Sequence, residues 1–73
     1  TMSLYEMYKN DEQDARQFAE HGLHKEAAMY WKSAASLRIL HTKTSHSATF
    51  DKGHFEAWEY CKEREAYHSA LAQ

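Results

Sequence analysis

Gly22 constrains the fold more than any other residue, because it separates two stretches in which apolar residues recur at helical spacing. The first stretch repeats at three- and four-residue steps through Leu4, Tyr8, Asp11, Ala15, Phe18 and Ala19, and the second through Ala27, Ala28, Trp31, Ala34, Ala35 and Arg38. Glycine readily takes the left-handed conformation that commonly closes a helix. So short a connection joins two antiparallel neighbours. The sequence therefore predicts a helical hairpin, with helices over about residues 4–21 and 24–40.

Helix-start signals refine this pattern and predict a third helix. Ser3 and Glu6 have the spacing of a capping box at the start of the first helix. The Thr- and Ser-rich segment "HTKTSHSATFDKG" predicts a loop over about residues 41–53. Asp51 is a suitable N-cap for a helix over about residues 54–71. One broad face of that helix would carry Phe55, Trp58, Cys61 or Lys62, Glu65, His68 and Leu71.

Three helices without a strand signal predict an all-α domain that takes in all 73 residues. A domain of this size buries only about 60% of the surface that its unfolded chain exposes, so its core is small. We expect the core at Phe18, Ala19, Gly22, Ala27, Ala28, Trp31 and Ala34. We expect a solvated charged face at Lys9, Glu12, Asp14, Arg16 and Lys25.

Charge and composition exclude several classes of function. Nine Lys and Arg against eleven Asp and Glu leave a formal charge of -2. Strong direct DNA binding is disfavoured, because most of its affinity would come from basic side chains at phosphates. A single cysteine cannot form an internal disulfide, and the sequence shows neither a signal-peptide pattern nor an apolar run of membrane-spanning length. We expect a soluble cytoplasmic protein with no membrane association.

Catalytic and metal chemistry find little support. Cys61 with a histidine could in principle act as a nucleophile, but a three-helix domain this small predicts no substrate pocket or oxyanion site. His21 and His24 are three residues apart, yet the helix-breaking glycine lies between them and zinc favours four ligands. We therefore expect no enzyme activity, no cofactor and no bound metal.

Aromatic side chains are the strongest functional signal. Two Trp, five Tyr and three Phe are more than so small an interior can hide. Exposed aromatic clusters usually mark contact surfaces. The predicted partner or oligomer interface comprises Phe50, Phe55, Trp58, Tyr60, Arg64 and Tyr67. A homo-oligomer is expected, because the third helix leaves several of these side chains without cover.

The segment "GLHKEAAMYWKSAASL", residues 22–37, resembles the centre of a single tetratricopeptide-like unit, although no 34-residue repetition follows. More of the chain resembles the ANR family, the AraC negative regulators, which are small bacterial and phage proteins. The matching positions are Ala15, Ala19, Gly22, Leu23, Ala27, Ala28, Trp31, Tyr60, Arg64 and Tyr67. A neighbouring family, the PerC-like regulators, shares the "AAxxW" hairpin.

The ANR resemblance implies a transcriptional regulator that binds AraC-class activators and lowers their activity, or that engages nucleoid-structuring proteins. The sequence therefore predicts regulation by protein contact. Two alternatives remain open at this point: a PerC-like activator associated directly with nucleic acid, and a histidine-based metal-binding module.

Overall fold

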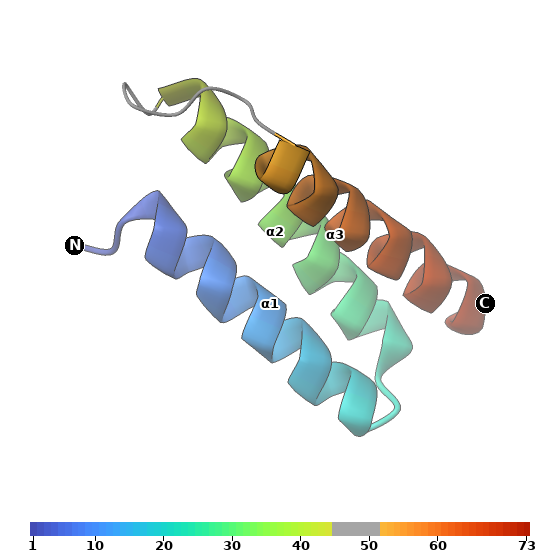
Figure 1. Ribbon diagram of the computed structural model, residues 1–73. Helices are drawn as coiled ribbons and strands as arrows, with labels where there is room; N and C mark the ends of the chain where they lie inside the picture. Colours follow the sequence, from blue (N-terminus) through green and yellow to red (C-terminus); the bar gives the residue numbers. More distant parts are fainter. Residues whose placement is uncertain (45–51) are drawn as a thin grey trace.

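The computed structural model describes residues 1–44 and 52–73, and these residues form three α-helices. Helix α1 comprises Leu4–Glu20, α2 comprises His24–Thr44 and α3 comprises Lys52–Leu71. The helix axes are roughly parallel, and consecutive helices run in opposite directions, as Figure 1 shows. This arrangement confirms the predicted all-α fold, with a helical hairpin and a third, C-terminal helix. The predicted N-cap Asp51 and interface residue Phe50 lie outside the described residues.

Both ends of α1 are closed by local hydrogen bonds. The Ser3 hydroxyl accepts from the Glu6 amide at 3.1 Å, and the Glu6 carboxylate accepts from the Ser3 amide at 3.3 Å, which completes the capping box. At the other end, the Leu23 amide donates to the Phe18 carbonyl at 2.9 Å and the Gly22 amide to the Ala19 carbonyl at 3.0 Å. These two bonds form a Schellman motif around Gly22, whose φ is +74°.

The predicted loop over residues 41–53 is wrong at both of its ends. Helix α2 continues through Thr44, and α3 already begins at Lys52. Thr42 and Thr44 donate their hydroxyls to the carbonyls of Arg38 and Leu40, at 3.0 and 2.9 Å. Because both hydroxyls are satisfied one turn back along the helix, these threonines are accommodated in α2 where their residue type had suggested a loop.

Helix α2 is the centre of the fold. Both α1 and α3 pack against it, and far less against each other. The Cα atoms span 39 × 27 × 14 Å, so the molecule is a flat slab. A slab of this shape leaves much of α1 and α3 facing solvent.

The core lies along the inner side of α2. Its buried members are Tyr8, Ala15, Ala27, Trp31, Ala34, Ala35 and Cys61, with Ala28 nearly as well buried. The alanines allow the helices to approach closely, and Trp31 is the largest fully buried side chain. Phe18 and Ala19 are only partly buried, and Gly22 is exposed. Gly22, which is expected in the core, therefore supports the fold through its backbone conformation at the turn and does not pack in the core.

Candidate functional site

The surface of α3 carries Tyr60, Arg64 and Tyr67, which we call the α3 stripe. Their spacing of four and then three residues places them on one side of a helix. Tyr60 is 49% exposed and Tyr67 is 51% exposed, whereas Arg64 is partly buried. Tyrosine and arginine, with tryptophan, are the residue types enriched at the energetic centres of protein interfaces.

Contacts within the protein hold the α3 stripe in place. The Tyr60 ring meets the buried Trp31 ring edge to face, with centroids 5.6 Å apart. The Arg64 guanidinium carbon lies 4.5 Å from the centroid of the Tyr67 ring. Because these side chains already have neighbours that order them, a partner would cost them less conformational entropy than free side chains.

The remaining predicted interface residues divide between surface and core. Phe55 is 42% exposed and contacts Trp58, with ring centroids 5.8 Å apart. Trp58 is partly buried and packs against the core cluster. Trp58, predicted as an interface residue, therefore also contributes to the packing of the core.

A buried polar cluster joins all three helices, and it corrects one prediction. Glu12, expected on a solvated face, is only 4% exposed. Its carboxylate accepts from Arg38 Nε at 2.5 Å and from the Cys61 thiol at 3.4 Å. The Arg38 guanidinium carbon in turn lies 4.3 Å from the centroid of the Tyr8 ring. Glu12 is buried because α1 turns it inward one turn after Tyr8, toward the cation on α2.

This cluster changes the chemistry of the lone cysteine. Burial, together with the neighbouring Glu12 carboxylate, raises the pKa of Cys61 to about 12. The thiol is therefore protonated at neutral pH, and a protonated thiol is a poor nucleophile. Cys61 acts here as a buried hydrogen-bond donor.

The two histidines flanking Gly22 do not face one another. His21 is exposed, and its Nδ1 donates to the Gln17 carbonyl at 2.8 Å. His24 instead contacts His68 of α3, with 2.9 Å between their Nδ1 atoms. His68 is 2% exposed, and no spacing in the sequence indicates its pairing with His24. Within residues 1–44 and 52–73, no group of three or more His, Cys, Asp or Glu is placed to hold a metal ion.

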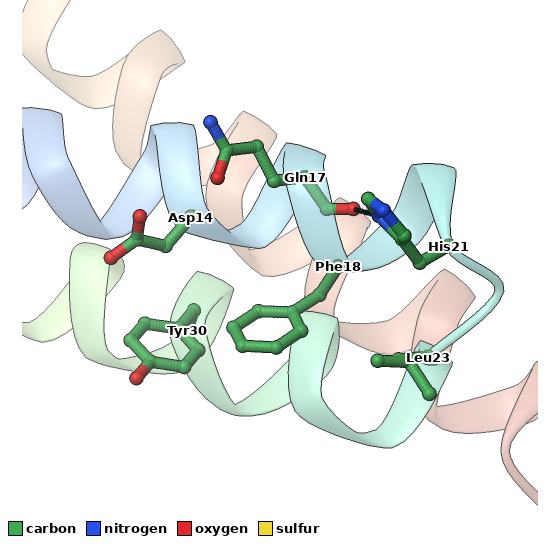
Figure 2. Close-up of a pocket in the computed structure, with 6 residues that line it drawn as sticks. All are labelled: Asp14, Gln17, Phe18, His21, Leu23 and Tyr30. Carbon is green, nitrogen blue, oxygen red and sulfur yellow. Dashed lines mark hydrogen bonds between the residues drawn. The ribbon is translucent and has the colours of Figure 1, made fainter.

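A surface pocket of about 390 Å³ lies beside the α1–α2 turn (Figure 2). Phe18 and Tyr30 stack in it, with ring centroids 5.2 Å apart. Asp14 and His21 lie toward opposite ends of the view in Figure 2. Phe18, predicted as core, therefore also lines a surface pocket.

No protein-family model, no curated protein and no solved structure matches the chain significantly. Among the described helices, none is long and apolar enough to cross a membrane. The α3 stripe and the contacts that order it are the features of the molecule that bear most directly on function.

Proposed function

We propose that this chain is a small regulator that acts by protein contact through the α3 stripe. The observation that carries the proposal is the pair of half-exposed tyrosines, Tyr60 and Tyr67, with Arg64 between them on one side of α3. The resemblance to the ANR family supplies the class of partner. That partner would be an AraC-class transcription activator, which the chain would inhibit, or a nucleoid-structuring protein.

The architecture supports a binding role for α3. Only one side of this helix is needed for packing on α2, because α1 and α3 make few contacts with each other. The Tyr60 ring rests on the buried Trp31, so the stripe is joined directly to the rigid core. A large side chain that is anchored in this way can bury its exposed part against a partner without reorganising the fold.

Charge makes protein contact the better proposal than direct DNA binding. The chain has a formal charge of -2, and within the α3 stripe Arg64 is the single basic residue. One phosphate contact would supply only a small part of the affinity that DNA-binding proteins obtain from many such contacts. Arginine stacked on tyrosine is instead typical of protein interfaces.

Tyr67→Ala should weaken binding to an AraC-class activator by about 2 kcal/mol, or roughly 30-fold in Kd, if Tyr67 is an interface centre. Calorimetry with purified activators would measure this loss, and a promoter reporter in bacteria would show relief of inhibition. Tyr5→Ala is the matched control, because Tyr5 is 52% exposed but lies on α1. Equal effects of the two substitutions, with helical circular dichroism unchanged, would contradict a role for the α3 stripe.

Self-association through the same surface is part of this proposal, since a symmetric dimer would bury the α3 stripes of two copies against each other. Sedimentation of the wild-type chain at about 100 µM, which would populate even a ~10 µM dimer, should show a species larger than the monomer. Tyr67→Ala should shift this species toward monomer, and Tyr5→Ala should not. A wild-type chain that sediments as a clean monomer would remove self-association from the proposal.

A further inference from the structure

Two histidines join the beginning of α2 to the last turn of α3. His24 is the first residue of α2, and His68 lies in the last turn of α3. Their rings are nearly parallel, with an interplanar angle of 17°, and they meet edge to edge, with centroids 5.2 Å apart and 2.9 Å between their Nδ1 atoms. His68 is 2% exposed and His24 is partly buried, so the contact is shielded from water on the His68 side.

The neighbour of His68 determines which nitrogens carry protons. Arg64 Nη2 lies 3.3 Å from His68 Nε2, and a guanidinium can only donate hydrogen bonds. His68 Nε2 must therefore accept, so the His68 proton is on Nδ1. That proton is donated to His24 Nδ1, which leaves the proton of His24 on Nε2. Hydrogen bonds thus run in one direction, from Arg64 through His68 to His24.

This series of hydrogen bonds cannot take up another proton without losing one of its bonds. A proton on His24 Nδ1 would put two N–H groups against each other at 2.9 Å. A proton on His68 Nε2 would face the Arg64 guanidinium, so the hydrogen bond would be replaced by repulsion between like charges. Protonation at either nitrogen therefore breaks one hydrogen bond of the series.

The charged groups around His68 act in opposite directions on its protonation. From α3, Arg64 faces His68 directly, and the uncharged Tyr67 ring meets it edge to face at 5.0 Å. From α2, His24 is the first residue of its helix and meets the His68 ring. Lys25 and Glu65 line a neighbouring groove between the same helices. The negative end of α3 favours a charged His68, against the effect of Arg64.

We propose that Arg64, His68 and His24 form a pH-sensitive clasp that holds the C-terminal part of α3 against α2 and opens when a single proton enters it. Opening would free the end of α3 and release Arg64 from one of its two contacts. The histidine clasp stands on its own geometry and does not depend on the proposed function. If the α3 stripe does bind a partner, the histidine clasp would make that binding sensitive to pH, because Arg64 belongs to both.

The direction of the pH effect follows from the titration of His68. Burial, then the charge of Arg64 and then His24 lower the pKa of His68 below its ordinary value of 6.5. As the pH falls below about 6.5, the unfolded chain takes up a proton that the folded chain still excludes. Folding stability is therefore lost from about pH 6.5 down to the lower pKa of the folded state, and it is fully present above that window.

The experiment follows the histidine ring signals of the wild-type chain by NMR from pH 8 to 4.5, with amide hydrogen exchange at several pH values. The His68 ring should titrate below 6.5, and protection factors should fall first at the C-terminal end of α3. Denaturant unfolding should show the ratio of folded to unfolded chain falling by up to about tenfold per pH unit for each excluded proton.

Two variants separate the histidine clasp from general acid sensitivity. In His68→Phe, the steep loss of stability below pH 6.5 should be reduced, because the excluded proton is removed. His21→Gln is the matched control, since His21 is exposed, and it should keep the wild-type pH dependence. A His68 ring that titrates at 6.5 or above in the wild-type chain would overturn the proposal. An unchanged slope in His68→Phe would overturn it as well, and if that variant does not fold, the wild-type titration decides.

Discussion

Trp31→Ala should lower the free energy of unfolding by about 3–5 kcal/mol, the cost typical of truncating a buried aromatic side chain. Trp31 is 2% exposed and is the largest fully buried side chain of the core. Its ring contacts both outer helices, because the Arg16 guanidinium carbon lies 5.2 Å from its centroid and Tyr60 meets it edge to face. Since small domains have little stability in reserve, we expect loss of helical circular dichroism at room temperature or a large fall in the urea midpoint.

Trp31→Phe is the control for this prediction. The indole N–H of Trp31 is buried and has no hydrogen-bond acceptor among the described residues. Phenylalanine removes that unpaired donor while keeping most of the aromatic volume, so it should cost clearly less than alanine. If Trp31→Ala unfolds at the same urea concentration as the wild-type chain, Trp31 does not hold the three helices together.

Glu12→Ala should destabilise the fold by about 3 kcal/mol, at the lower end of the range for breaking a buried ion pair. The side chains of Arg38 and Glu12 are 17% and 5% exposed, so the substitution leaves a guanidinium that is mostly shielded from water without its carboxylate. The lower end is expected because Arg38 retains some contact with solvent. Urea unfolding followed by circular dichroism measures the change.

The comparison for Glu12→Ala is Glu63→Ala, in which an exposed glutamate on α3 is removed. A surface substitution of this kind usually changes stability by less than about 0.5 kcal/mol. The double variant Glu12→Ala with Arg38→Met should recover part of the loss, because no unpaired charge is then left inside. A Glu12→Ala protein as stable as Glu63→Ala would show that the buried cluster contributes nothing to the fold.

Local patterns were sufficient to predict the helices. Ser3 and Glu6 at capping-box spacing, and Gly22 between two apolar stripes, each specify a helix end within a few residues. The prediction failed at the end of α2, where Thr42 and Thr44 bond back to the helix. Residue type alone does not distinguish a threonine that breaks a helix from one that extends it.

The candidate site was only partly predictable. Tyr60, Arg64 and Tyr67 share one side of α3 by spacing, so their grouping follows from the sequence. Trp58 was assigned to the same surface, but the structure packs it against the core. Spacing along one helix fixes the angular positions of its side chains around the helix axis. It does not specify which of these positions the neighbouring helix will cover.

The sequence by itself determined the elements of this protein: three helices, the reversal at Gly22, and an inner face of α2 built from alanines and Trp31. These follow from local propensities and periodicity, which act over one or two helical turns. Only the tertiary structure determined which polar side chains of different helices contact one another. Glu12 meets Arg38 and Cys61, and His24 meets His68, across 26 to 49 residues of chain. No local pattern encodes such contacts, because they depend on the rotation and register at which separate helices pack.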